Sequence, residues 1–177
     1  LGLQAGLVGL IIVSIYLILY YRVLGFIAIL GLSTFGLLFY SVISLLGEFQ
    51  GFTLTLSGIA GIIVSIGLAA DSYIVTFEKY KDEIKIGRSF QFAADKAATD
   101  AWKTILTADF VSLSAATLLY ILAIGPIRGF ALALGVATIF DLIFTRLYTR
   151  NLVPYISGIS NNVRFYFPIK TKDLAND

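Results

Sequence analysis

The sequence contains no cysteine, no histidine and no methionine. Without cysteine, the chain cannot form disulfides, thiolate metal sites or a cysteine nucleophile. Without histidine, proton chemistry falls to carboxylates, tyrosines, water or a partner, because the side chain that titrates nearest to neutral pH is missing. Without methionine, and with Leu1 at its start, the chain is expected to be a processed or excised piece of a longer protein.

Charged residues are also scarce, at 14% of the chain, whereas 58% of the residues are hydrophobic. Soluble domains have about 45–50% apolar residues, and the mean hydropathy here is +0.90. The apolar residues stand in long blocks rather than in the short alternating strands of an outer-membrane barrel. The sequence therefore predicts an all-α, polytopic membrane helix bundle. A net charge of +2 is too small to indicate nucleic-acid binding.

Five apolar blocks are long enough to cross a bilayer, whose hydrocarbon core of about 30 Å needs roughly 20 helical residues. The predicted transmembrane helices cover about residues 3–20, 23–46, 54–77, 104–124 and 127–148. Arg22 separates the first two, so we expect a tight helical hairpin there. Together these helices make residues 1–152 a transmembrane domain, with a connector at 78–103 and a tail at 153–177.

Lysine and arginine are distributed unevenly about these predicted helices. Arg128 lies on one side, and the rest of the 13 lysines and arginines lie on the other. Short loops rich in these residues stay in the cytoplasm, so the connector and the tail are predicted to be cytoplasmic. From Phe90 to Trp102 the apolar residues recur near helical spacing, which favours a short amphipathic helix along the inner membrane face.

Three aspartates, Asp71, Asp109 and Asp141, lie inside the predicted transmembrane helices. A carboxylate in a membrane is costly unless it is protonated, paired or wetted, so each is a functional candidate. Counted inward from the nearest charged boundary residue, all three lie roughly 7–11 Å below the inner surface. We expect them to form one polar cluster facing the bundle interior or a water-filled cavity, and to be proton-coupling residues.

Two of the acids also have a structural interpretation. Asp141 lies five positions before Arg146, so a local ion pair competes with a functional role. Nearby hydroxyls would satisfy Asp109 as a buried structural group; they belong to Thr104, Thr107, Ser112 and Ser114. The residues from Gly67 to Ser72 offer Asp71 no internal basic partner, which favours a functional role for this acid.

Small residues recur every four positions ahead of Asp71, at Ser57, Gly61, Ser65 and Ala69. Such a stripe lets another helix approach closely. Protonation of the nearby acid would remove its charge and change how two parts of the bundle pack. Tight packing without any motion is the alternative interpretation.

Several ordered motifs resemble the SecD members of the SecD/SecF family of bacterial protein-export membrane proteins. The longest runs from Thr55-Leu-Ser-Gly through Asp71 to Glu83, followed by Gly87-Arg88-Ser89. Three shorter ones are Thr104-Ile105-Leu106 through Asp109, Gly125-Pro126-Ile127-Arg128-Gly129-Phe130, and Tyr20-Tyr21-Arg22 with Gly25. The resemblance extends from about Gly6 to Leu152. It departs from the family pattern at Ala70, where valine is common, and at Thr107-Ala108-Asp109, where Asp-Ala-Asn is common.

The resemblance implies a half-bundle of the resistance-nodulation-division (RND) superfamily that lacks its first transmembrane helix and its exterior domain. It implies a subunit that is not an enzyme and that uses the proton-motive force to help the Sec translocase export unfolded polypeptides across the bacterial cytoplasmic membrane. The implied partners are a paralogous SecF-like subunit, the Sec translocon and the polypeptide, with protons in place of a cofactor. Asp71 would be the coupling acid.

Three other functions compete with this one. An exporter of lipids or small amphiphiles from the same superfamily would also couple to protons. An intramembrane aspartyl protease would use two aspartates on neighbouring helices, but it would be expected to carry a Gly-x-Gly-Asp element, which the run from Gly67 to Asp71 does not supply. A passive anchor would tolerate replacement of Asp71 by asparagine.

Overall fold

The computed structural model describes residues 2–50, 56–149, 151 and 155, and within these residues all regular secondary structure is helical. The helices are α1 (Gly2–Gln50), α2 (Leu56–Lys85), α3 (Phe90–Leu122) and α4 (Pro126–Phe144), followed by a π-helical turn, Thr145–Thr149. All four α-helices are long and apolar enough to cross a membrane. A helix satisfies its backbone hydrogen bonds internally, which hydrocarbon surroundings require.

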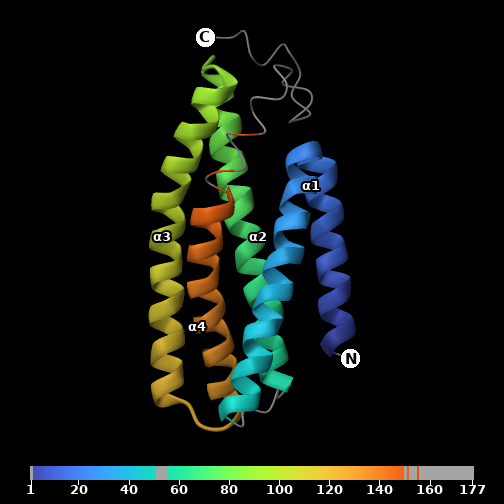
Figure 1. Cartoon of the computed structure of the whole chain (residues 1–177), viewed down its shortest axis with the longest axis vertical. Coiled ribbons are helices and arrows are strands. Elements are labelled where there is room, and N and C mark those ends of the chain that lie inside the picture. Colours follow the sequence, from blue (N-terminus) through green and yellow to red (C-terminus); the bar gives the residue numbers. More distant parts are fainter. Residues whose placement is uncertain (1, 51–55, 150, 152–154, 156–177) are drawn as a thin grey trace.

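The structure has four such helices where five are predicted, because α1 runs through both of the first two predicted segments. Its backbone leaves helical geometry at Arg22, with φ 47° and ψ −113°. Figure 1 shows the two arms of α1 lying side by side, joined by this bend. A Cβ at Gly25 would lie 2.0 Å from the carbonyl oxygen of Leu17, so only glycine permits so close a return. The predicted hairpin is present as a bend within one helix.

The connection between α2 and α3 is shorter than the predicted connector. α2 continues to Lys85 and α3 begins at Phe90, so residues 86–89 alone separate them. Gly87 has a φ of +86°, and Ser89 occupies the N-cap position with an extended backbone. The segment from Phe90 to Trp102 belongs to the continuous helix α3, and its alanines pack into the bundle instead of lying on a membrane surface.

α4 packs against each of the other three helices. Figure 1 shows α3 and α4 side by side, with the arms of α1 on the opposite side of the bundle from α3. The turn before α4 combines Gly125, at φ +62°, with Pro126 at the first helical position, where a missing N–H costs nothing. α3 and α4 therefore run antiparallel.

Aromatic rings fill the interior between α1, α2 and α4. Neighbouring ring centroids lie 4.9 to 6.5 Å apart, within the range of favourable stacked and edge-on contacts. We call this set the aromatic cluster: Tyr21, Phe35 and Phe39 of α1, Tyr73 and Phe77 of α2, Phe140 and Phe144 of α4, and Tyr148 of the π-helical turn. It fixes the second arm of α1 against α2 and α4.

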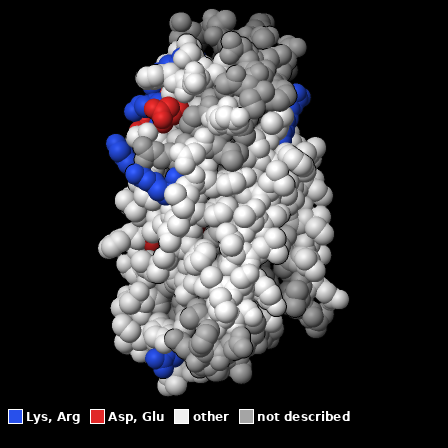
Figure 2. Space-filling model, viewed as in Figure 1, with Lys and Arg blue, Asp and Glu red and all other residues white. Residues whose placement is uncertain are grey.

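Most charged side chains lie near the two ends of the bundle. Figure 2 shows basic groups gathered where α2 ends and α3 begins, a second basic patch at the opposite end, and a wide, almost uncharged belt between them. Large apolar side chains are exposed along this belt, among them Leu37, Phe110 and Leu147. An apolar exposed belt of this width is what contact with lipid requires. The predicted tail at 153–177 lies outside the described residues, apart from Tyr155.

Candidate functional site

The three predicted acids lie on three helices but not in one environment. Asp109 on α3 and Asp141 on α4 are 5% and 4% exposed. Asp71 on α2 is exposed, although its neighbours Ala70 and Ser72 are buried. The expectation of one interior cluster is therefore wrong for Asp71, because each step along a helix rotates the side chain by about 100°.

Helix packing places Asp109 opposite Asp141. α3 and α4 approach closely at Gly135, where an added Cβ would lie 3.6 Å from the Cβ of Ala116. Asp109 lies two helical turns, about 10.5 Å, before Ala116 on α3. An equivalent step past Gly135 on the antiparallel α4 reaches Asp141 and Leu142. The two carboxylates lie close enough to interact electrostatically.

Asp141 is the most connected of the three acids. The hydroxyl of Ser72 on α2 donates a hydrogen bond of 2.6 Å to its Oδ2 atom, and the hydroxyl of Thr145 also bonds to it. Asp71 interacts with Asp141 electrostatically from the outer side of α2. Among the residues whose burial the structure describes, all but one of the buried polar residues belong to this region, and we call them the polar cluster: Ser72, Thr76, Asp109, Thr138, Asp141 and Thr145.

Asp109 has a buried Oδ2 atom without a hydrogen-bond partner among the described residues. Three of the four hydroxyls expected to satisfy it are used elsewhere. Those of Thr104, Thr107 and Ser114 donate to carbonyl oxygens of their own helix, at Asp100, Lys103 and Phe110. The interpretation of Asp109 as a structural group held by these three hydroxyls is therefore wrong.

Arg146 does not pair with Asp141 in the part of the chain that the structure describes. Its guanidinium lies 5.1 Å from the centroid of the Trp102 ring, and the side chain is exposed. Five positions along a helix turn a side chain by about 140° away from the first. The local ion pair is therefore wrong, and the acid pair faces the interior without a basic partner from α4.

The stripe of small residues on α2 lies against α4 around Gly61. A Cβ added there would lie 2.9 Å from the Cβ of Ala133 and 3.1 Å from the carbonyl oxygen of Phe130. Ser65 and Ala69 are both 1% exposed, and Ser57 is half-buried. The hydroxyl of Ser65 donates a hydrogen bond to the carbonyl oxygen of Gly61 on its own helix, so it needs no hydrogen-bond partner from α4.

Sequence reasoning missed the residues that hold the acids. Ser72 and Thr145 bond to Asp141, and the Trp102 ring contacts Arg146, the basic residue that was expected to pair with Asp141. A signal for Thr145 was available, because it follows Asp141 by four positions and so shares its helix face. Ser72 and Trp102 act between helices that are distant in sequence, so no local pattern identifies them.

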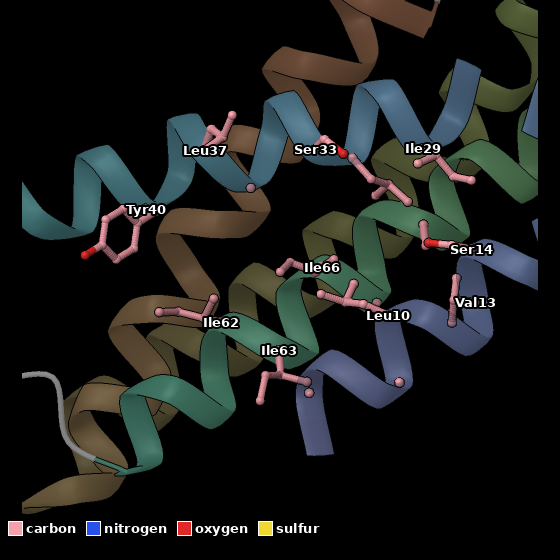
Figure 3. A pocket seen from close by; sticks show the side chains of 16 residues that line it. Leu10, Val13, Ser14, Ile29, Ser33, Leu37, Tyr40, Ile62, Ile63 and Ile66 are labelled. Carbon is pink, nitrogen blue, oxygen red and sulfur yellow. The ribbon is translucent and has the colours of Figure 1, made fainter. Parts of the chain in front are cut away.

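A groove of about 580 Å³ lies between the two arms of α1 and α2. Figure 3 shows its mostly apolar wall, with Leu10 and Val13 on the first arm, Tyr40 on the second and Ile62 and Ile66 on α2. Three glycines in its lining leave space open, because a Cβ at Gly9, Gly36 or Gly67 would meet nothing within 4 Å. One end of the groove reaches Ala70, beside Asp71.

The sequence matches a family model over residues 2–158, and the family is described as protein export membrane protein SecD/SecF, C-terminal. The chain belongs to the SecD/SecF family. It corresponds to the C-terminal membrane portion of SecD, which makes it a multi-pass membrane protein of bacterial type. The motifs around Asp71 and Gly125 are thus correctly assigned to this family.

Relatives and solved structures agree with this assignment. The chain is 47% identical to the protein translocase subunit SecD of Mycobacterium tuberculosis over 160 residues, which are 90% of this chain and 28% of the relative. It is 45% identical to SecD of Streptomyces coelicolor over 152 residues, 86% of this chain and 27% of the relative. A crystal structure of SecDF from Thermus thermophilus, described as a translocon-associated membrane protein, superposes with a TM-score of 0.84 at 29% identity, covering 96% of this chain and 23% of that one. The chain therefore spans between a quarter and a third of these SecD relatives.

Proposed function

We propose that this chain is the proton-coupled membrane part of a Sec translocase subunit that helps to export unfolded polypeptides across the bacterial cytoplasmic membrane. The observation that carries the proposal is the exposed carboxylate of Asp71 in the apolar helix α2 of a SecD/SecF chain. A charged group facing lipid is costly, so it requires a partner, water or a proton. Each of these would make the position of α2 depend on the state of Asp71.

The proposal includes a topology. Each arm of α1 crosses the bilayer, which gives five crossings in an RND-type half-bundle. The end where α2 meets α3 faces the cytoplasm, since its loops carry the lysines and arginines that orient membrane proteins. The C-terminal tail is then cytoplasmic, and the groove lies in the half of the bundle nearer the exterior.

A SecF-like paralogous subunit is the proposed partner at Asp71. Ala60, Val64, Gly67 and Asp71 are exposed on one face of α2, at spacings of three and four residues. Space is open beside Gly67, where an added Cβ would meet nothing within 4 Å. Small exposed residues at this spacing suit close approach by another membrane helix. The Sec translocon and the emerging polypeptide would be contacted through parts of the subunit outside this chain.

Protonation of Asp71 gives the coupling its physical basis. A neutral carboxyl group can lie against an apolar partner helix, whereas an ionised one must remain with water or a cation. Proton entry from one side and release to the other would then alternate between two packings of α2. Asp109 and Asp141, which lie behind α2 at the same level, complete the proposed set of proton-coupling acids.

The test is proton-gradient-dependent export in vesicles that contain the full-length subunit and its partner, comparing Asp71 with Asp71→Asn at matched expression. We expect the gradient-dependent part of export to fall by at least tenfold while the assembly stays intact. Asp82→Asn is the matched control, because Asp82 is an exposed acid on the same helix, close to its cytoplasmic end. Unchanged gradient stimulation in Asp71→Asn would reject this role and favour a passive anchor.

A second candidate function is proton-coupled export of lipids or small amphiphiles, and the groove favours it. An apolar groove that ends beside an acid would accept an amphiphile, with its hydrocarbon chain in the groove and its polar head near the acid. Gly36→Leu would fill the groove at a point where nothing is displaced. If amphiphile transport is the function, this variant would lose it; under the primary proposal, polypeptide export continues.

A further inference from the structure

We propose that Asp109 and Asp141 form a second proton-binding site, an internal acid pair that holds one exchangeable proton between its two carboxyl groups. The inference deepens the proposed function and rests on it only for the source of the protons. The pair lies between α3 and α4, on the inner side of α2, whereas Asp71 lies on the outer side. The two sites are therefore physically separate.

Burial makes two negative charges at this place unfavourable. Both acids are more than nine-tenths buried, on antiparallel helices that approach each other at Gly135 and Ala116, and they interact electrostatically. Transfer of an ionised carboxylate into a low-dielectric interior is costly, and two neighbouring carboxylates disfavour each other's ionised form. A bound proton is the simplest way to remove one of the charges.

The hydrogen bonds suit a pair with one proton and one negative charge. Two hydroxyls, of Ser72 and Thr145, face Asp141. In contrast, the buried Oδ2 atom of Asp109 has no donor among the described residues. This asymmetry gives the two carboxyl groups different surroundings, which is the arrangement that separates the roles of paired acids.

No basic side chain neutralises the pair within the described residues. From the π-helical turn, Arg146 is held on Trp102. From α3, the nearest lysine, Lys103, is exposed and lies almost two turns away. From α1, Arg22 lies at the bend between the two arms, and α2 contributes a further negative charge at Asp71.

A metal ion fits this place less well than a proton. Multivalent hard cations take six or more oxygen ligands, usually with several carboxylates. The described part of the chain contains no group of three or more histidine, cysteine or acidic side chains that could hold a metal ion. A proton requires only the two carboxyl groups that are present.

The pair is connected to Asp71 through the adjacent residue of α2. Ser72, which bonds to Asp141, is the next residue after Asp71, and Asp141 and Asp71 interact electrostatically. A negative charge on either site therefore opposes a negative charge on the other. The charge state of the pair and that of Asp71 are therefore linked through α2.

Infrared difference spectroscopy of the full-length subunit with its partner, in lipid nanodiscs with ¹³C-labelled aspartate, tests the inference. A protonated carboxyl group absorbs separately from a carboxylate, so a buried proton gives a signal at a pH where exposed acids are ionised. We expect one such signal to disappear in Asp109→Asn and in Asp141→Asn, with no further loss in the double variant. Asp95→Asn, an exposed acid on α3, is the control and should change nothing.

Several results would overturn the inference. A signal that persists in the double variant would place the proton elsewhere, and separate signals lost one at a time would mean two independent acids. A signal that vanishes when sodium replaces potassium at constant pH would identify a metal-cation site instead. Ser72→Ala retains both acids, so it should shift the signal without removing it, and it keeps the test valid if the asparagine variants fold poorly.

Asp71→Asn separates this inference from the proposed function. The pair should keep its signal in that variant, even though gradient-driven export is lost. If export proves independent of Asp71 while the pair still gives its shared signal, the proposed function fails and the acid pair stands. Loss of the pair's signal in Asp71→Asn would instead show that the proton belongs to Asp71.

Discussion

The two sides of α2 differ in what fills them. Towards α1, the aromatic cluster packs large rings such as Phe77 and Phe35, which are 0% and 1% exposed. Towards α3 and α4, small residues permit close helix approach around Gly61, and the polar cluster lies beyond them. Large interlocked rings fix one arrangement, whereas small residues and titratable groups allow two packings of similar free energy. The acid pair therefore lies on the side of α2 where packing is small and polar, while Asp71 lies on its exposed face.

The largest expected effect on stability comes from removing a ring from the aromatic cluster. Phe77→Ala should lower the free energy of unfolding by about 3 kcal/mol, at the low end for buried phenylalanine because lipid offers the unfolded helices an apolar solvent. Thermal unfolding in nanodiscs measures the change. Phe110→Ala is the control, because Phe110 is 70% exposed. Equal losses in the two variants would show that the cluster does not fix the bundle.

Overfilling the small side of α2 should cost somewhat less. Gly61→Leu would force side-chain atoms into Ala133 and Phe130, and we expect about 2 kcal/mol of destabilisation from overpacking. Gly67→Leu is the matched variant on the same helix, where nothing lies within 4 Å. The same unfolding assay should separate the two. If Gly61→Leu is as stable as Gly67→Leu, the close approach of α2 and α4 is not required.

Removing one hydroxyl from the polar cluster should have a smaller effect. Ser72→Ala removes the donor to Asp141, and a buried hydrogen bond to a charged group contributes roughly 1.5–3 kcal/mol, less when the acceptor is neutral. We expect about 1 kcal/mol if the acid pair is partly protonated. Ser65→Ala, whose hydroxyl bonds within its own helix, should change stability by less than about 0.5 kcal/mol. A reversed order would contradict the role of Ser72.

The smallest effect is expected at the rim of the polar cluster. Arg146→Ala removes the cation over Trp102, an exposed contact of about 0.5–1 kcal/mol. Trp102 is the one tryptophan of this sequence, so its fluorescence reports the contact once any tryptophan elsewhere in the full-length subunit is replaced. The emission should change in Arg146→Ala and remain unchanged in Arg88→Ala, since Arg88 lies over Phe92. An unchanged emission would place Arg146 elsewhere.

The sequence predicts helices well and the environment of the acids less well. Apolar block length identifies the four helices that, among the described residues, are long and apolar enough to cross a membrane, and the hairpin at Arg22 follows from one charge between two blocks. Connections are harder, because a helix that continues beyond the membrane, as α2 does to Lys85, shows no local stop signal. Likewise, residues 90–102, which were predicted to lie on the membrane surface, form the first part of the continuous helix α3.

Side-chain direction explains why the acids are harder to place. Depth along a helix follows from counting residues, and Asp141 interacts electrostatically with both Asp109 and Asp71. Rotation about the helix axis depends on which neighbour each face meets, and that is decided by packing between distant segments. Asp71 is exposed because Ala70 and Ser72 face the interior, and Arg146 is drawn to Trp102 on another helix rather than to Asp141.

Proton flux measured during polypeptide translocation tests whether Asp71 couples protons to export, in proteoliposomes that hold the full-length subunit, its partner and the translocon. We expect a flux that appears only while polypeptide moves, disappears in Asp71→Asn and persists in Asp82→Asn. A flux of the same size in Asp71→Asn would contradict it, because protons would then cross without the one exposed acid that the structure places within the membrane-spanning part of α2.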